Sequence, residues 1–300
     1  MAYQAVEQGE GYLEFEGVRY HYASWSPVGR LRQPDRFDAS GSVPVVLVHG
    51  FAQSTRTWRQ VGEALGRERP VFAIDLVGHG ESERPAASAA YALAAQGRVL
   101  RAGVERVACA IAPPVVVGYS MGGRVALAAL MDAPEAFAAN TSGLVLESAG
   151  LGPATADGRA RAAAADAARA AQLRERGVEA FMEEWERLPL FASQTALPAE
   201  VRAAVRAERL ANDAEVLART FERAGQHVMP LRAETMTALR ALAARGVPIV
   251  YAAGALDVKY AALAADLRER VPSARVVVIP GAGHDVHLEA PGKFLALFAR

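Results

Sequence analysis

Short, continuous runs of apolar residues recur from residue 45 onward, and most are separated by enough chain for a helix. The first is Val45-Val46-Leu47-Val48, which ends at His49-Gly50. A run without polar alternation is typical of a strand buried on both faces, as in a parallel sheet. Alternating strands and helices with right-handed crossovers predict an α/β fold with a mostly parallel, doubly wound sheet. The later runs of this kind are Val71–Ile74, Val115–Val117, Leu144–Leu146, Pro248–Tyr251 and Arg275–Ile279.

The N-terminal part of the chain follows another pattern. Residues 12–22 alternate in character around Gly17, which predicts an antiparallel hairpin at an edge of the sheet. Residues 26–43 are rich in Pro, Gly, Asp and Arg, and this composition predicts a surface loop.

The alternation of strand and helix is interrupted between about residues 151 and 235. This stretch holds no convincing strand, and its Ala/Arg/Glu-rich segments predict helices over 159–176, 178–187, 199–211 and 213–224. Ligands bind at the carboxyl edge of open α/β sheets, so a helical insertion at that edge would roof the site. We therefore expect a core of residues 1–150 and 236–300 and a helical cap, or lid, of residues 151–235.

Charge and composition restrict the classes of partner. The 300 residues include 33 basic and 33 acidic side chains, and this balance gives no indication of a nucleic-acid or membrane-surface partner. No apolar run approaches the roughly 20 residues that span a bilayer, and the N-terminus lacks a basic and then apolar signal pattern. We expect a cytoplasmic protein that is a monomer or a small homo-oligomer.

The single cysteine, Cys109, lies in an apolar helical stretch and cannot form an internal disulfide. A buried, unreactive thiol is the prediction for such a position. This cysteine usage fits a reducing compartment.

The strand predicted at Val115–Val117 leads into Gly118-Tyr119-Ser120-Met121-Gly122 and then into an apolar helical segment, Arg124–Met131. This G-x-S-x-G pattern places a serine in a strained strand-to-helix turn, where the glycines let strand and helix approach closely. The motif alone is weak evidence, and a plain strand-to-helix turn is the alternative. The flanking strand and helix favour Ser120 as a nucleophile.

A serine hydroxyl becomes reactive at neutral pH when a histidine accepts its proton and a carboxylate orients that histidine. In this kind of fold the acid and then the histidine follow the serine along the chain, each on a loop after a strand. Asp257 and His284 follow the last two predicted strands in that order. Both are therefore predicted at the same sheet edge as Ser120, where the three would form a catalytic triad.

Other ionisable residues compete for these roles. Glu147 also ends a strand and is the alternative acid, whereas Asp285 is adjacent to His284 and is expected to point away from it. The remaining histidines are predicted to shape loops or line the pocket (His49 and His79), to be structural (His287), or to lie in solvent or core with no partner pattern (His21 and His227).

An oxyanion hole needs two backbone N–H groups directed to the place where negative charge develops. Met121, the residue after the nucleophile, is predicted to supply one of them, and Phe51, just after His49-Gly50, the other. The glycine-rich segment 75–82 is predicted to shape the wall of the site.

Four strings extend this pattern: GYSMGGR around Ser120, GALDVKY around Asp257, GAGHDVHLEAPGKF around His284, and WERLPLF at Trp185–Phe191. From about residue 44 to its end the chain resembles the α/β-hydrolase superfamily. More narrowly, the strings resemble the 2-succinyl-6-hydroxy-2,4-cyclohexadiene-1-carboxylate synthases of menaquinone biosynthesis, which eliminate pyruvate from a tricarboxylate precursor. The resemblance implies that arginines bind the carboxylates of an anionic small-molecule substrate.

Guanidinium groups suit this role because they form bidentate, charge-assisted pairs with carboxylates. Arg124 lies four residues after Ser120, on the same face of the helix, and can reach the pocket. Arg159 matches a pattern of spaced arginines before an aspartate, but Ala162 stands where the family tends to have a second arginine, so Arg161 is an alternative ligand. The positions that match the family's arginines are Arg124, Arg159 and Arg209.

Arg209 precedes Leu210-Ala211-Asn212-Asp213, which resembles the family's arginine before an asparagine-rich turn. Many arginines occur in this region, and a solvent-exposed position is the alternative for each. Three aromatic residues are also assigned to substrate binding: Tyr119, Trp185 and Phe191. For Trp185 and Phe191 a place in the core of the cap is the alternative.

The resemblance implies a lyase in which Ser120, activated by His284, removes a proton α to a carbonyl while Asp257 orients the imidazole. The N–H groups of Phe51 and Met121 would stabilise the enolate-like charge. We expect neither a metal nor an organic cofactor, because the sequence has no clustered His/Cys ligands, phosphate-binding glycine loop or dinucleotide fingerprint.

Two other functions remain open. One is an ester, thioester or carbon–carbon bond hydrolase that uses the same triad, which analogy of fold does not exclude. The other is a non-catalytic relative that binds a ligand or a partner protein. Several arginines in the site would favour the lyase, because a site for neutral esters has no need of them.

Overall fold

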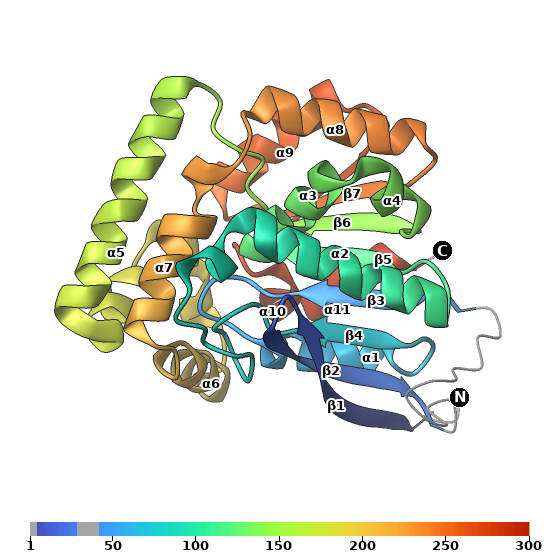
Figure 1. Ribbon diagram of the computed structural model, residues 1–300, viewed down its shortest axis with the longest axis horizontal. Helices are drawn as coiled ribbons and strands as arrows, with labels where there is room; N and C mark the ends of the chain where they lie inside the picture. Colours follow the sequence, from blue (N-terminus) through green and yellow to red (C-terminus); the bar gives the residue numbers. More distant parts are fainter. Residues whose placement is uncertain (1–4, 29–41, 300) are drawn as a thin grey trace.

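The computed structural model describes residues 5–28 and 42–299. These residues form one eight-stranded sheet in the order β1-β2-β4-β3-β5-β6-β7-β8 (Figure 1). The pairs β1·β2 and β2·β4 are antiparallel, and all other pairs are parallel, so the predicted α/β fold is confirmed. The strands are β1 Val6–Phe15, β2 Val18–Pro27, β3 Val45–Val48, β4 Val71–Ile74, β5 Val115–Tyr119, β6 Gly143–Glu147, β7 Ile249–Gly254 and β8 Arg275–Ile279.

The predicted hairpin is present and is longer than the alternating pattern suggested. Its turn lies at Glu16 and Gly17, which both adopt positive φ, 51° and 74°. Strand β2 continues through Pro27, so the first two residues of the predicted loop at 26–43 belong to the sheet. Residues 29–41 of that predicted loop lie outside the described residues.

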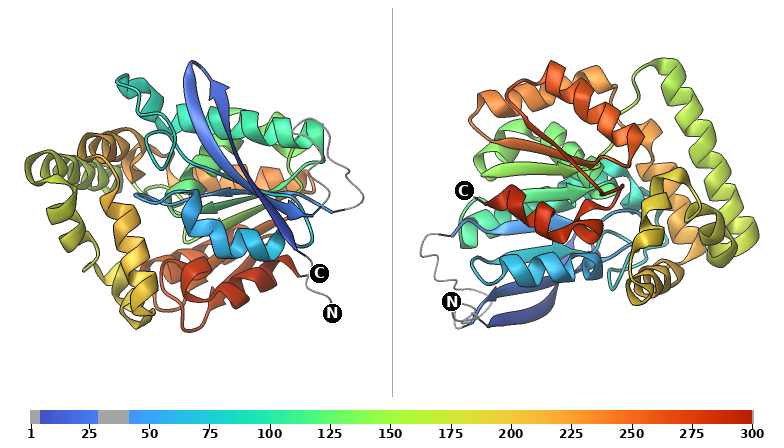
Figure 2. Two further views of the ribbon diagram at one scale, coloured as in Figure 1. Left: turned by 90° about the horizontal axis from the view of Figure 1, so that it is seen from below. Right: turned by 180° about the vertical axis from the view of Figure 1, so that it is seen from behind.

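Helices cover both faces of the sheet (Figure 2), and alternate strand residues face each layer. Val46 and Val48 join the apolar core beneath α2, α3, α8 and α9, whereas Val45 and Leu47 join the core beneath α1, α10 and α11. This double burial explains the apolar runs without polar alternation. The helices on these faces are α1 Arg59–Leu65, α2 Leu93–Ala110, α3 Met121–Asp132, α4 Pro134–Ala139, α8 Arg232–Ala244, α9 Val258–Arg270, α10 Val286–Glu289 and α11 Pro291–Leu295.

Three further helices lie beyond one end of the sheet (Figure 1): α5 Ala156–Trp185, α6 Ala199–Leu210 and α7 Ala214–Ala224. A kink at Gly177, with φ 75° and ψ 175°, divides α5 at the boundary between the two helices predicted there. Their apolar residues form a third core, which includes Ala52 from the loop after β3. This contact places the helices against the carboxyl edge of the sheet.

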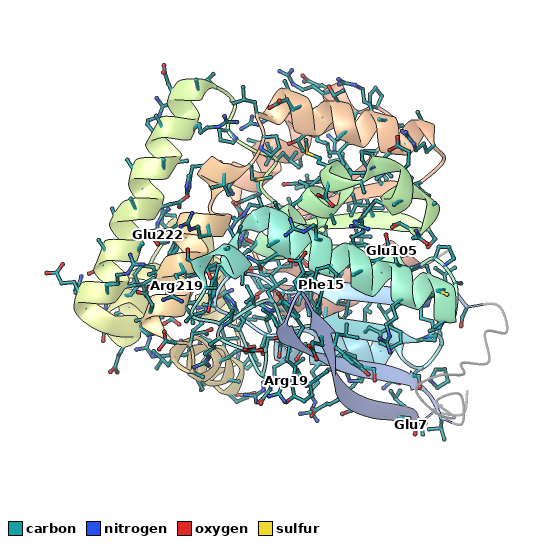
Figure 3. The ribbon with its side chains drawn as sticks, in the orientation of Figure 1. Glu7, Phe15, Arg19, Glu105, Arg219 and Glu222 are labelled. Atoms are coloured by element: carbon teal, nitrogen blue, oxygen red, sulfur yellow. The ribbon has the colours of Figure 1, made fainter. Side chains whose placement is uncertain are left out.

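Ion pairs join two helices of this region, α5 and α7. Arg174 on α5 donates hydrogen bonds to both Glu215 and Glu222 on α7, and Figure 3 shows Glu222 beside α5. Arg219 on α7 also pairs with Glu215, at 2.9 Å. The short 3₁₀ helices are η1 Thr55–Trp58, η2 Ser88–Tyr91, η3 Pro189–Ala196, η4 Gln226–Val228 and η5 Ala296–Phe298.

The prediction of a buried Cys109 is wrong, because this residue is exposed on α2. Val104 on the same helix is fully buried. A separation of five residues turns the side chain about 140° around a helix, so Cys109 faces away from the core. None of the helices in the described part of the chain is both long and apolar enough to cross a membrane.

Candidate active site

Ser120 lies in the turn between β5 and α3, in a conformation that non-glycine residues rarely adopt, with φ 50° and ψ −103°. Such strain persists only where the surrounding structure enforces it, and it is concentrated at functional sites. The turn requires glycine at Gly122, because a Cβ there would lie 2.2 Å from the carbonyl oxygen of Val48. The tight approach of α3 to β3 thus exposes the Ser120 hydroxyl at the end of the sheet.

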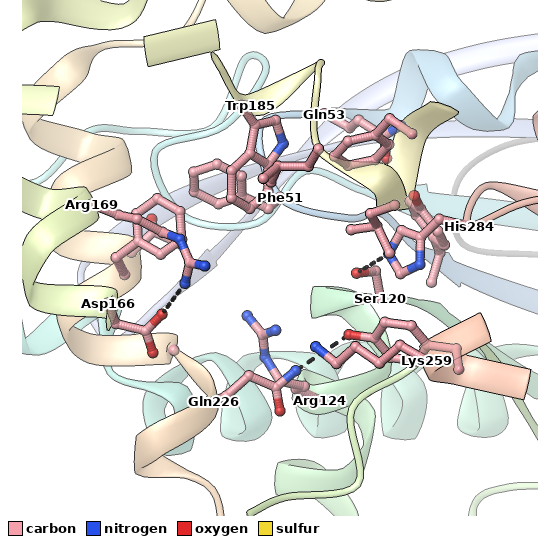
Figure 4. Close-up of a pocket in the computed structure, with 18 of the residues that line it drawn as sticks. Phe51, Gln53, Ser120, Arg124, Asp166, Arg169, Trp185, Gln226, Lys259 and His284 are labelled. Carbon is pink, nitrogen blue, oxygen red and sulfur yellow. Dashed lines mark hydrogen bonds and ion pairs between the residues drawn. The ribbon is translucent and has the colours of Figure 1, made fainter. Parts of the chain in front are cut away.

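The structure brings the other two predicted triad residues into a chain with this hydroxyl, and Figure 4 shows the contact between His284 and Ser120. His284 Nε2 is 2.9 Å from Ser120 Oγ, and His284 Nδ1 is 2.7 Å from Asp257 Oδ2. Asp257 and His284 are almost fully buried. Asp257 is held in place as the cap of α9, where its Oδ1 accepts the Tyr260 N–H at 3.2 Å. The three groups can therefore relay a proton from the hydroxyl to a histidine whose orientation is fixed.

The two backbone groups predicted for an oxyanion hole lie at the same edge. Met121 is the first residue of α3, and N–H groups in the first turn of a helix have no partner within it. Phe51 follows Gly50, where a Cβ would lie 2.5 Å from the Tyr119 ring. Only glycine allows the loop after β3 to come this close to β5. The positive end of α3 adds to the attraction for negative charge here.

A cavity of ≈ 260 Å³ opens in front of Ser120 and His284, between the sheet edge and the helices α5 to α7. Four cationic side chains line it, and Asp166 is the one carboxylate among the lining residues. This excess of positive charge is local, because the whole chain is neutral. The cations are Arg124, Arg169, Arg209 and Lys259.

Arg124 reaches the cavity from α3, as its position four residues after Ser120 suggested. Its Nη2 donates to the carbonyl oxygen of Ala224 at 2.9 Å, and its Nε is buried without a partner. Burial lowers the pKa of Arg124. Among the described residues no carboxylate pairs with it, so this guanidinium can bind an anionic ligand.

Arg169 on α5 also faces the cavity, although it was not among the arginines predicted to bind substrate. Its Nη1 donates to Asp166 Oδ1 at 3.1 Å, and Figure 4 shows it opposite Arg124. Its position three residues after Asp166 could have indicated this role, because that spacing places the two side chains on one face of a helix. Arg159 is not among the residues that line the cavity, and it donates to the carbonyl oxygen of Met229 at 3.1 Å. Arg161 is exposed.

Arg209 is 4% exposed and lines the cavity. It donates to Glu186 Oε1 at 3.1 Å and to Gln194 Oε1 at 3.2 Å. Its guanidinium lies 4.8 Å from the centre of the Phe191 ring. These contacts fix its direction, and the carboxylate of Glu186 is shared with Arg206.

Aromatic side chains form the remaining wall. The rings of Phe51 and Trp185 lie 5.2 Å apart, and the ring of Phe191 lies edge-on to His284 at 5.8 Å. The ring of Phe221, a residue not predicted to line the site, lies 4.4 Å from that of Phe51. Tyr119 is buried between the rings of His284 and His287 and also lines the cavity.

The alternative acid, Glu147, does not reach the candidate histidine. Its carboxylate accepts from Nδ1 of His287 at 2.9 Å, and Asp285 is turned to His287 and Gln53. Ligating atoms of Glu147, Asp285 and His287 lie within 4.8 Å of one another. Within the described part of the chain, this is the group of side chains that could hold a metal ion. Glu147 already accepts a hydrogen bond from Nδ1 of this imidazole, and Asp285 Oδ1 lies 3.1 Å from the same nitrogen.

The other histidines contact the backbone or acids. His49 Nδ1 donates to the carbonyl oxygen of Gly50 at 2.7 Å, and His79 Nδ1 donates to that of Val77 at 3.0 Å, so both shape loops. His21 and His227, for which the sequence shows no partner pattern, lie 2.8 Å from Asp75 and 2.9 Å from Asp166, residues too distant in sequence to show one. His21 is buried, as a core histidine would be.

Comparisons with known proteins agree with this arrangement. A family model described as the alpha/beta hydrolase family matches residues 45–297. A Bacillus subtilis (strain 168) protein named putative 2-succinyl-6-hydroxy-2,4-cyclohexadiene-1-carboxylate synthase is 32% identical over 279 residues, which cover 93% of each chain. The Salmonella enteritidis PT4 synthase of that name is 34% identical over 252 residues, 84% of this chain and 90% of its own.

A solved structure titled "Structure of MenH from S. aureus" is also similar. It has a TM-score of 0.76 and 28% sequence identity, and the match covers 87% of this chain and 94% of that one. The match to the family model includes the Ser120, Asp257 and His284 loops, and the match to the synthases extends over most of the chain. The chain therefore belongs to the alpha/beta hydrolase family, in the group that contains the 2-succinyl-6-hydroxy-2,4-cyclohexadiene-1-carboxylate synthases.

Proposed function

We propose that the protein is a carbon–oxygen lyase. It eliminates pyruvate from 2-succinyl-5-enolpyruvyl-6-hydroxy-3-cyclohexene-1-carboxylate and forms 2-succinyl-6-hydroxy-2,4-cyclohexadiene-1-carboxylate. The observation that carries this proposal is the combination of four cations with the hydrogen-bonded Ser120–His284–Asp257 chain around one cavity. A substrate with three carboxylates needs such a set of cations, whereas a neutral ester does not.

In this proposal the cations bind the substrate and fix its orientation. Arg124 has no carboxylate partner among the described residues, and it binds one substrate carboxylate beside Ser120. Arg209 and Arg169 bind the other carboxylates from the helical cap, residues 151–235. Guanidinium groups already directed by Glu186 and Asp166 lose little freedom on binding.

The chemical step is a proton transfer followed by loss of the leaving group. His284 accepts the proton of the Ser120 hydroxyl as that oxygen removes a proton α to a carbonyl of the substrate. The electron pair of the broken C2–H bond forms a double bond between C2 and C3, the C3=C4 double bond shifts to C4=C5, and the C5–O bond to the enolpyruvyl group breaks. The enolate of pyruvate then takes a proton from the imidazolium of His284.

The surrounding groups stabilise the charge that appears. The N–H groups of Phe51 and Met121 bind the developing enolate oxygen, because preorganised donors in a dry site are effective there. Asp257 holds the tautomer of His284 that can accept a proton at Nε2. The aromatic wall of Phe51, Trp185, Phe191 and Phe221 excludes water from the reacting atoms.

A hydrolase is the second candidate, because the same hydrogen-bonded serine can attack a carbonyl. One experiment separates the two. The purified protein is given the enolpyruvyl tricarboxylate, and pyruvate release is followed beside hydrolysis of p-nitrophenyl acetate. We expect pyruvate in stoichiometric amounts and slow ester hydrolysis, whereas rapid ester hydrolysis without pyruvate would overturn the lyase assignment.

A further inference from the structure

A second histidine and carboxylate cluster lies behind the cavity, next to the loop that carries His284. We name Glu147, Asp285 and His287 the His287 cluster; all three are buried. His287 Nδ1 lies 2.9 Å from Glu147 Oε2 and 3.1 Å from Asp285 Oδ1. On the opposite side of the ring, His287 Nε2 lies 2.9 Å from Thr57 Oγ1. None of the three cluster residues lines the cavity.

Stability alone is a weak explanation for this cluster. Taking three ionisable groups out of water is costly, and replacing buried ion pairs by apolar residues is often neutral or stabilising. Burial on its own lowers the pKa of His287, but the charges of Asp285 and Glu147 outweigh it and the pKa is raised. Burial raises the pKa of Glu147. The imidazole thus lies between two carboxylates, Glu147, which accepts from its Nδ1, and Asp285, 3.1 Å from the same nitrogen.

Through Asp285 the cluster reaches the loop that carries Phe51. Asp285 Oδ2 accepts from Gln53 Nε2 at 3.0 Å, and Gln53 Oε1 accepts from the Gly50 N–H at 3.3 Å. Gly50 precedes Phe51, whose N–H is a proposed oxyanion donor. Asp285 itself follows His284 in the chain. One carboxylate therefore connects the histidine loop to the oxyanion loop.

Through Glu147 the cluster also reaches the serine. The backbone carbonyl of Glu147 accepts the Ser120 N–H at 2.8 Å, and its side chain accepts the His287 N–H at 2.9 Å. Glu147 thus joins the strained serine turn to the segment that follows His284. Glu147 and Asp285 bind the same imidazole, so His287 is the point at which all three loops meet.

We propose that His287 is a positioning residue, which holds Glu147 and Asp285 together and so aligns the Phe51 loop, Ser120 and the His284 loop with one another. The inference rests on the proposed roles of Ser120, His284 and Phe51. His287 touches no substrate, so its loss affects turnover more than capture of the tricarboxylate. A misplacement of reacting groups by about 1 Å lowers turnover by about 10²-fold.

The test uses His287→Gln and Thr57→Val, and it measures the rate at which a fluorophosphonate probe labels Ser120. Labelling needs the triad and the oxyanion hole but not the natural substrate, so it remains informative if the lyase proposal fails. We expect His287→Gln to be labelled about 10- to 100-fold more slowly and Thr57→Val about 3- to 10-fold more slowly. With the tricarboxylate, kcat falls and KM stays within about twofold.

A matched control removes another buried histidine that pairs with a carboxylate. His21 lies 2.8 Å from Asp75 and has no bond to the three loops. His21→Gln is expected to lower the melting temperature and leave the labelling rate unchanged. Thr57→Val preserves shape at a half-buried position, so it provides the answer if His287→Gln fails to fold. A folded variant labelled at the wild-type rate, or slowed only as much as His21→Gln, overturns the proposal.

Discussion

The carboxyl edge of the sheet and the helical segment above it contribute to the same cavity by different physical means. At the sheet edge the polar groups are buried and held by backbone contacts, as Ser120 is by the carbonyl of Glu147. On α5 to α7 the charged groups pair mostly with one another near solvent, as Arg174 does with Glu215 at side-chain exposures of 39% and 45%. Exposed pairs of this kind contribute about 0–1 kcal/mol each.

This difference separates chemistry from recognition. Proton transfer needs reacting atoms placed to within a fraction of an ångström, and the strands supply that rigidity. Binding of carboxylates tolerates more movement, because a charge acts over a longer range. Substitutions at the sheet edge should therefore reduce turnover, and substitutions on the helices should reduce affinity.

The largest effect is expected at the sheet edge from Ser120→Ala, with His284→Ala as its partner. Each removes a member of the hydrogen-bonded chain, and turnover should fall by at least about 10³-fold. The measurement is kcat for pyruvate release, with circular dichroism as a check of folding. Because the two groups act as a unit, the double variant should lose little more than either single one. Additive losses would contradict a shared step.

Arg124 lies between the sheet edge and the helices α5 to α7, and Arg124→Met should show the next largest effect. The side chain keeps its length and loses the charge, which removes a charge-assisted bond to the substrate. The loss in kcat/KM should be about 30- to 100-fold, mainly through KM. Arg124→Lys, which retains the charge but not the fork of donors, is the control and should recover part of the loss. An unchanged KM in Arg124→Met would remove this residue from the site.

The sheet edge was also more accessible to prediction from sequence than the helices were. Apolar strands and the fixed order of serine, acid and histidine along the chain allowed Ser120, Asp257 and His284 to be chosen from local pattern alone. The arginines of α5 share one helical surface with little apolar contrast, so the sequence could not show that Arg169 turns inward and Arg159 does not. Asp75, the partner of His21, and Glu147, a partner of His287, lie far away in sequence from these histidines, and only the fold brings them together.

The buried histidines of the sheet edge should also make that region sensitive to acid. Burial and the charge of His49 lower the pKa of His79 to about 3, well below the ordinary value of 6.5. The unfolded chain then binds the proton first, so stability falls as the pH drops from about 6.5 towards 3. At pH 5 the loss is about 2 kcal/mol relative to pH 7.

Urea unfolding at pH 5, 6 and 7 measures this dependence, and His79→Gln provides the comparison. The variant lacks the titrating group, so its free energy of unfolding should change less with pH than that of the wild type. The pKa of His49 is also lowered by burial, so part of the acid sensitivity should remain in the variant. Equal slopes in both proteins would show that His79 is protonated without penalty in the folded state.

The smallest effect, and the sharpest test of the helical region, compares Arg169→Ala with Arg159→Ala. Both arginines belong to α5 and both are half-buried, but Arg169 faces the cavity whereas Arg159 bonds the backbone of Met229. Arg169→Ala should raise KM for the tricarboxylate about 10-fold with kcat nearly unchanged, because it removes a single charge-assisted contact. Arg159→Ala should change KM less than about twofold.

Raised salt should weaken binding of the tricarboxylate to the wild type more than to Arg169→Ala, because one electrostatic attraction is already absent from the variant. The reverse ranking of the two variants would mean that α5 turns a different face to the substrate, in which case the resemblance would be a better guide than the contacts of Arg169.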